Sequence, residues 1–163
     1  MTNRGAGDTR MAKTGVDMRK EKGRLAFLSE DAVQGFTAHC GLEPVSLEPG
    51  RFVTRVHIRD CHLQQDGFVH AGLIATMADH TAGYASFSLV PPDRRILTVE
   101  YKINFLVPAS GDYLECRSRV IKPGKTLLVT ESEVYAVRGG REVLVAKAML
   151  TMAAVPKNKV PSP

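Results

Sequence analysis

One carboxylate stands out because of its surroundings. Asp79 lies in the middle of residues 70–87, a segment of small and apolar residues that begins with His70. Burying a carboxylate among apolar residues is costly unless it has a partner or a task. A carboxylate in such a place can attack a carbonyl carbon, or take a proton from a water molecule that does so. These residue types therefore favour acyl chemistry.

The periodicity of the same segment predicts a helix, since its apolar residues recur at helical spacing: Leu73, Ile74, Met77, Ala78, Tyr84 and Ala85. Nine residues separate His70 from Asp79. In one helix this places them roughly 13 Å apart along the axis and about 180° apart around it. The two side chains therefore do not reach one reacting atom from the same helix. Either they have unrelated tasks, or the start of one helix meets the middle of another in a two-fold dimer.

The start of this helix is a second chemical feature. The backbone N–H groups of residues 70–72 open the helix and have no acceptor within it, and the helix dipole there favours negative charge. A thioester carbonyl resting on the Ala71 N–H would be stabilised as its oxygen becomes an oxyanion. A carboxylate from the other chain of such a dimer would then attack the carbonyl carbon, or take a proton from a water molecule that does so.

The remaining elements predict an antiparallel sheet. Residues 51–59 alternate as a strand, and residues 96–105, 114–120, 126–138 and 142–154 follow as four more, separated by turns rich in Gly and Pro. Short connections between successive strands require antiparallel pairing, so we expect the last four to form a meander. A single helix must cover the apolar face of this sheet. The expected architecture is α+β, with the sheet curled around the central helix.

The ends of the chain differ from its body. Residues 1–24 carry a net charge of +4, residues 157–163 carry +2, and residues 25–156 carry −1. We expect a disordered basic leader over residues 1–27, one domain over 28–155 and a disordered tail over 156–163. Ser29 is expected to cap a short helix that ends near Gly41.

Composition argues against several protein classes. No run of apolar residues is long enough for a membrane helix, and there is no signal-peptide pattern, so we expect a soluble, cytoplasmic protein. The net positive charge lies in the tails, which argues against nucleic-acid binding by the body of the protein. Three widely spaced cysteines, Cys40, Cys61 and Cys116, form no metal-ligand pattern and are expected to be small buried residues.

The segment Gln64-x5-His70-Ala-Gly72-x6-Asp79, followed by TVEYKINFLVPA and KPGKTLLVTESEVY, closely resembles the PaaI-like hotdog-fold acyl-CoA thioesterases over about residues 28–154. The resemblance implies the hotdog fold and makes Asp79 the nucleophile or general base. It also implies that Gln64 places the carbonyl or the water, and that Thr98 assists the attacking group. Ala71 would supply the oxyanion-hole N–H. The family usually has Gly at this position, and the methyl group of Ala71 would narrow the approach of the acyl group and so affect the size of the substrate.

The resemblance further implies an acyl-CoA substrate, no cofactor and no metal, and a homodimer that commonly pairs into a tetramer. Gly72 belongs to the matched motif and is expected to contact substrate. The turn that holds Lys122, Gly124, Lys125 and Thr126 is expected to contact the pantetheine or the phosphates of coenzyme A. The alternative for this segment is a plain hairpin turn with solvated lysines. For His70, the alternative is that it simply caps the helix.

Two other functions fit the same fold. A hotdog hydratase typically has an Asp and a His five residues apart, whereas Asp66 and His70 are four apart and Asp66 lies in a turn. A non-catalytic acyl-CoA sensor would need a DNA-binding partner, because the leader is too short and too polar to form such a domain. The sequence therefore favours hydrolysis of an acyl-CoA thioester.

Overall fold

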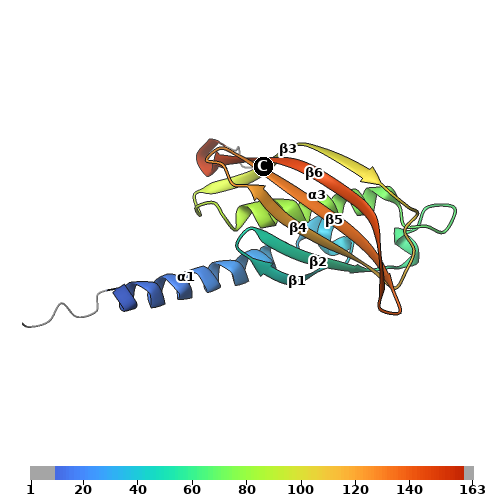
Figure 1. Cartoon of the computed structure of the whole chain (residues 1–163), viewed down its shortest axis with the longest axis horizontal. Coiled ribbons are helices and arrows are strands. Elements are labelled where there is room, and N and C mark those ends of the chain that lie inside the picture. Colours follow the sequence, from blue (N-terminus) through green and yellow to red (C-terminus); the bar gives the residue numbers. More distant parts are fainter. Residues whose placement is uncertain (1–9, 160–163) are drawn as a thin grey trace, which may run out of the picture.

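The computed structural model describes the backbone of residues 10–159 and the side chains of residues 18–159. Its principal elements, labelled in Figure 1, are α1 (Arg10–Asp31), α2 (Gly35–His39), β1 (Leu42–Glu48), β2 (Arg51–His57), α3 (Ala71–Phe87), β3 (Arg94–Phe105), β4 (Tyr113–Lys122), β5 (Leu127–Arg138) and β6 (Arg141–Pro156). Single 3-10 turns follow β2 at Asp60–His62 and β6 at Lys157–Lys159. None of the helices in residues 10–159 is both long and apolar enough to span a bilayer.

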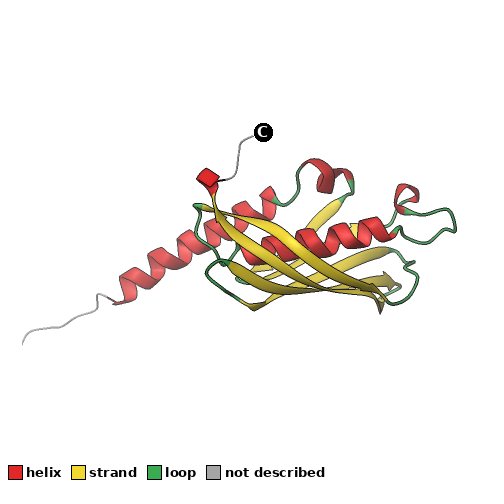
Figure 2. Ribbon diagram, turned by 90° about the horizontal axis from the view of Figure 1, so that it is seen from above, coloured by secondary structure: helices red, strands yellow, loops and turns green. Residues whose placement is uncertain are grey.

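Within the described residues, six strands form one antiparallel sheet in the order β1-β2-β4-β5-β6-β3. The sheet curves along α3, which lies on its concave side (Figure 2). This arrangement confirms the predicted α+β hotdog fold. The predicted meander is wrong, because β3 pairs with β6 at the far edge of the sheet and not with β4. Residues 106–112 carry the chain from that edge back to β4.

Small residues allow α3 to lie close to the sheet. Ala78, Ala82 and Ala85 are almost completely buried along the helix. Polar groups between helix and sheet are paired, as buried polar groups generally must be: Thr81 bonds Thr54 across 2.7 Å, and Ser132 donates to the Ala78 carbonyl across 2.7 Å. These bonds fix the rotation of α3 on the sheet.

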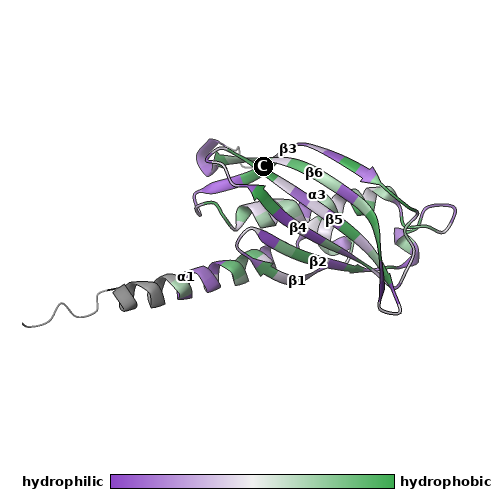
Figure 3. Ribbon diagram, in the orientation of Figure 1, coloured by the Kyte–Doolittle hydropathy of each residue, from purple (hydrophilic) through white to green (hydrophobic). Residues whose placement is uncertain are grey.

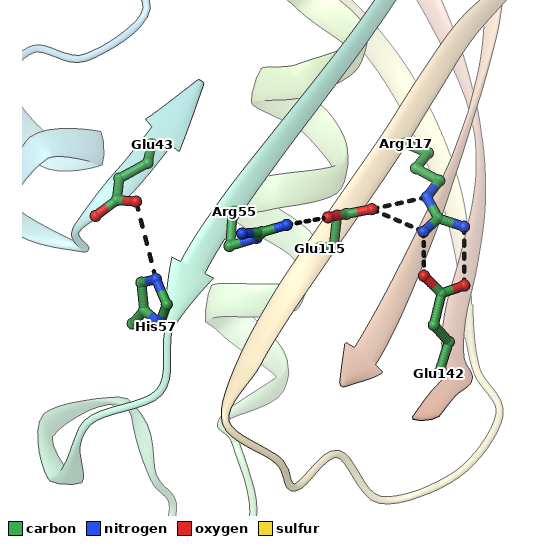
Figure 4. A network of polar contacts seen from close by, with 6 residues as sticks. All are labelled: Glu43, Arg55, His57, Glu115, Arg117 and Glu142. Atoms are coloured by element: carbon green, nitrogen blue, oxygen red, sulfur yellow. Dashed lines mark hydrogen bonds and ion pairs between the residues drawn. The ribbon is translucent and has the colours of Figure 1, made fainter. Parts of the chain in front are cut away.

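Hydrophilic and hydrophobic residues alternate along the strands of the sheet (Figure 3). A chain of ion pairs crosses it: Arg55 lies 2.8 Å from Glu115, which lies 2.7 Å from Arg117, and Arg117 also pairs with Glu142 (Figure 4). These residues come from β2, β4 and β6. The Glu115 side chain is only 10% exposed and is held by both arginines, whereas the pair of Arg117 with Glu142 is partly exposed and individually weak. Together these pairs favour one strand register.

The predicted disorder of residues 1–27 is wrong for residues 10–27, which belong to α1; residues 1–9 lie outside the described part. The C-terminal turns of α1 contact the body, where Leu28 is buried and Arg24 donates to the Phe87 and Val90 carbonyls. Such tertiary contacts stabilise a helix whose own sequence is polar and weakly periodic. Figure 1 shows the rest of α1 extending away from the sheet.

Other boundaries also differ from expectation. Ser29 lies inside α1 and caps nothing, and the chain bends after Asp31 into the separate short helix α2. At the C-terminus, the predicted disordered tail is wrong for residues 156–159, since β6 includes Pro156 and a 3-10 turn follows; residues 160–163 lie outside the described part.

Two of the three cysteines are buried as expected. Cys40 and Cys116 lie in the core, whereas Cys61 is exposed, so the prediction is wrong for Cys61. Burial raises the pKa of the Cys116 thiol to about 11. A thiol with so high a pKa is a poor nucleophile near neutral pH.

Candidate active site

The start of α3 is held by a side-chain cap. His70 has an extended backbone conformation (φ −62°, ψ 132°), and its Nδ1 accepts a hydrogen bond from the Gly72 N–H across 2.9 Å. The Leu73 N–H donates to the His70 carbonyl across 3.0 Å. Among the described residues, the Ala71 N–H has no acceptor. The capping interpretation of His70 is therefore confirmed, and Ala71 retains the free donor that the sequence predicted.

Gly72 makes this cap possible. A Cβ at position 72 would lie 2.9 Å from His70 Nδ1, closer than side-chain contacts normally allow. The Gly72 N–H is itself used by the cap, so the structure gives Gly72 a supporting role at the helix start. Its expected contact with substrate stays a prediction.

A cavity of about 370 Å³ lies beside this helix start. It brings Gln64 and Ala71 together, as predicted, although they are seven residues apart. The Gln64 Oε1 accepts from the Asp66 N–H across 2.6 Å, which fixes the turn before the helix. The other walls of this cavity are apolar residues of the same loop and helix and of the segment that ends β3: Phe68, Val69, Ile74, Phe105, Leu106, Val107, Pro108 and Ala109.

Asp79 lies half-buried in the middle of α3 and faces β3. Thr98 Oγ1 donates to Asp79 Oδ1 across 2.7 Å, and Thr98 stands where β3 bulges against β6. The structure thus places together the two residues that the family resemblance associated with the attacking group. Asp66, the acid of the hydratase alternative, is exposed in the turn before the helix and does not line the cavity around Asp79.

That second cavity, of about 360 Å³, extends from Asp79 along α3 toward its C-terminal end. Tyr84 donates to Asp31 of α1 across 2.7 Å, and His80 Nε2 donates to the Ala32 carbonyl across 2.8 Å. Burial raises the pKa of the Tyr84 hydroxyl and lowers the pKa of His80, so both side chains are neutral near pH 7. Sequence reasoning missed Asp31, because no pattern in the chain indicated that α1 reaches this cavity.

The two cavities share no lining residue. They flank opposite ends of the same edge strand, since Thr98 lies near the start of β3 and Phe105 ends it. The separation of His70 from Asp79 that the helical spacing predicted is confirmed. Within one chain, the Ala71 N–H and the Asp79 carboxylate therefore lie at two separate cavities, which we call half-sites below.

The predicted coenzyme A turn is exposed. Lys122 ends β4, and Gly124, Lys125 and Thr126 form the connection to β5. A Cβ at Gly124 would lie 2.1 Å from the Leu127 carbonyl oxygen, so this turn requires glycine. None of the four residues lines either half-site. Their contact with coenzyme A stays a prediction.

The part of the chain that the structure describes offers no obvious set of side chains for binding a metal ion. No group of three or more His, Cys, Asp or Glu side chains lies close enough together there to hold an ion. That the protein uses no metal and no cofactor stays a prediction from the sequence.

Comparison with known proteins supports the fold and identifies the family. The sequence model of the thioesterase superfamily matches residues 66–143, which include the start of α3, Asp79 and Thr98. The crystal structure of a thioesterase family protein from Silicibacter pomeroyi is 38% identical with a TM-score of 0.78, over 81% of this chain and 98% of that one. A Streptococcus mutans protein solved with acetyl CoA bound is 31% identical with a TM-score of 0.62, over 71% of this chain and 90% of that one.

A curated human relative, acyl-coenzyme A thioesterase 13, is 28% identical over 93 residues, which are 55% of this chain and 64% of that protein. The chain thus spans less than two thirds of that relative's length. The Silicibacter pomeroyi match, in contrast, covers nearly the whole of the similar structure at 38% identity. The chain therefore belongs to the thioesterase superfamily and is an enzyme with a hotdog fold.

Proposed function

We propose that the protein hydrolyses acyl-CoA thioesters to the free acid and coenzyme A, in active sites that two copies of the chain complete together. The observation that carries this proposal is the separation of the oxyanion donor, Ala71, from the carboxylate, Asp79, in two half-sites at opposite ends of β3. Coenzyme A as the leaving group is supported by the two relatives whose names include it.

The edge strand supports the dimer. β3 bonds β6 on one side only, and its other side carries no strand within residues 10–159. Large apolar side chains are exposed along β3: Leu97, Val99, Tyr101 and Phe105. An exposed apolar edge favours pairing with another strand. Antiparallel pairing of two β3 strands about a two-fold axis would bring the Thr98 end of one copy to the Phe105 end of the other.

In such a dimer each site has a donor and a base. The thioester carbonyl accepts a hydrogen bond from the Ala71 N–H of one copy, where the helix dipole stabilises developing negative charge. Asp79 of the other copy takes a proton from water as the water oxygen bonds to the carbonyl carbon. The tetrahedral oxyanion then collapses, the carbon–sulfur bond breaks, and the proton passes from Asp79 to the departing thiolate.

Supporting residues fix these two groups. His70 holds the first turn of α3 through the Gly72 N–H, and so aims the Ala71 N–H away from the helix. Thr98 occupies one Asp79 oxygen and leaves the other for water. Gln64, beside Ala71, lies where its amide can orient the carbonyl or the water. Direct attack by Asp79 on the carbonyl, through an anhydride, uses the same arrangement.

The test is release of free thiol from a panel of aliphatic and aromatic acyl-CoA esters by the wild-type protein and by Asp79→Asn. We expect kcat to fall by about 100-fold or more in the variant, because the amide cannot accept the proton. Binding of a non-hydrolysable acyl-CoA thioether should persist. Binding without hydrolysis by the wild-type protein would instead indicate an acyl-CoA sensor, and near-normal turnover by a folded Asp79→Asn would remove Asp79 from the mechanism.

A further inference from the structure

A third cavity lies beneath α1, apart from the two half-sites, and has a volume of about 640 Å³. Its apolar walls are Phe27 and Leu28 of α1, Phe87 at the end of α3, and Pro92 in the turn that follows. Three cations, Lys20, Arg24 and Lys157, line it together with one acid, Glu21. It is therefore an apolar space with a positively charged border.

Phe87 separates this cavity from the half-site of Asp79, because it lines both. Its ring centroid lies 6.0 Å from that of Tyr84 on the Asp79 side and 5.8 Å from the Arg24 guanidinium carbon on the α1 side. One aromatic ring at the end of a helix thus stands between the two spaces.

Arg24 fixes α1 over the cavity and forms part of its wall. Its guanidinium donates to the Phe87 carbonyl across 2.8 Å and also to the Val90 carbonyl. The Phe87 carbonyl ends α3, where a cation is favoured by the helix dipole, and Val90 follows three residues later. The Arg24 guanidinium is therefore already engaged by carbonyl groups of the protein itself. Lys20 and Lys157, both exposed at the border, are the cations that a ligand can reach.

We infer that this cavity receives the far end of the acyl group, and that the preferred substrates carry a carboxylate at that end. An apolar stem would pass Phe87 and lie against Phe27 and Leu28, and its terminal carboxylate would lie between Lys20 and Lys157. The inference rests on the proposed function, since it extends the acyl side of the Asp79 half-site. The excess of cations over acids in the lining favours an anionic end over a plain methyl end.

The test compares three esters: butyryl-CoA, dodecanoyl-CoA, and the mono-CoA thioester of dodecanedioic acid. The test variant is Lys20→Glu with Lys157→Glu. The matched control is Lys22→Glu with Lys159→Glu, which makes the same charge change on the same two elements but outside the cavity lining. The quantity compared is the ratio of kcat/KM for the dicarboxylic ester to kcat/KM for dodecanoyl-CoA.

We expect wild-type protein to prefer the dicarboxylic ester, the test variant to lower the ratio by about tenfold, and the control to preserve it. An unchanged ratio in the test variant would overturn the inference. An equal loss on all three esters would also overturn it, because the lysines would then contact the coenzyme A part. Wild-type hydrolysis of butyryl-CoA without either long ester would overturn the inference alone, whereas no hydrolysis of any CoA ester would overturn the proposed function as well.

Discussion

Thr98 on the edge strand β3 donates a hydrogen bond to Asp79 on α3, with 2.7 Å between Oγ1 and Oδ1. The bond joins an exposed residue to a half-buried one across the boundary between sheet and helix. Because a hydroxyl can donate only one hydrogen, Thr98 restrains one carboxylate oxygen and leaves the second available. The bulge of β3 at this point, between Thr98 and Glu100, sets the direction of the Thr98 side chain.

Replacing Thr98 by Val should therefore lower kcat by about tenfold, since the carboxylate loses the restraint that orients it. Val keeps the size and the β-branched shape of Thr, so stability should change little. Thr98→Ser restores the hydroxyl and should recover most of the activity. Thiol release from the best ester of the panel measures all three proteins. Equal activity of the Val and Thr forms would show that the bond has no role in turnover.

His70 acts through the helix start, and its cap can be tested apart from chemistry. His70→Ala should cost about 1 kcal/mol of unfolding free energy, as loss of an N-cap typically does. It should also reduce kcat, because the first turn that presents the Ala71 N–H frays. His70→Asn is the informative control, since Asn is a good N-cap.

Asn at position 70 should restore both stability and turnover if capping is the whole task of His70. Denaturant unfolding and thiol release, measured on the same preparations, separate the two effects. A stable His70→Asn protein with low kcat and unchanged KM would instead mean that the imidazole contacts the reacting groups.

The elements around α3 were predictable because their patterns are local. The helix begins at Ala71 and ends at Phe87 because the capping histidine and the two prolines, Pro91 and Pro92, limit it in the sequence itself. Strand β2 also follows its alternation, with Phe52 and Val56 fully buried. The pairing of Asp79 with Thr98 was predictable only through the family resemblance.

The position of β3 and the helix α1 were not predictable from local pattern. Leu97, Val99 and Tyr101 alternate like residues that face a core, yet each is roughly half exposed in the single chain. An edge strand that pairs with a second copy of the chain shows the same alternation of apolar residues as a strand inside the sheet. In α1, the contacts that fix the helix, such as Asp31 with Tyr84, join residues 53 positions apart. The short-range periodicity of a sequence does not indicate contacts between residues so far apart.

Because His80 is partly buried, we expect the free energy of unfolding to depend on pH. Burial lowers its pKa in the folded protein below the ordinary 6.5. The unfolded chain therefore binds more protons between the two pKa values, so the free energy of unfolding falls as the pH is lowered through 6.5. His80→Gln keeps a donor for the Ala32 carbonyl and should show a shallower fall.

Urea unfolding at several pH values across this range measures the effect. His62, whose pKa is lowered by burial and by the nearby Arg59, contributes in the same direction, so the slope should decrease in His80→Gln without disappearing. A slope that is identical in His80→Gln and wild type would contradict the prediction.

Two inactive variants should restore activity to each other if the half-sites of different copies combine. Ala71→Pro removes the proposed oxyanion donor, and proline is well tolerated as the first residue of a helix. The extended conformation of His70 suits a residue that precedes proline. Asp79→Asn removes the base. Each homodimer then lacks one component in both of its sites.

A mixed dimer differs, because one of its two sites takes Ala71 from the Asp79→Asn copy and Asp79 from the Ala71→Pro copy and is therefore intact. Random mixing during co-expression makes about half of the dimers mixed, so activity should recover to about a quarter of the wild-type value per chain. Differently tagged copies, purified through both tags, should reach about half. If the donor and the base instead acted within one copy, every site would lack one of them, and mixed dimers would be as inactive as either parent.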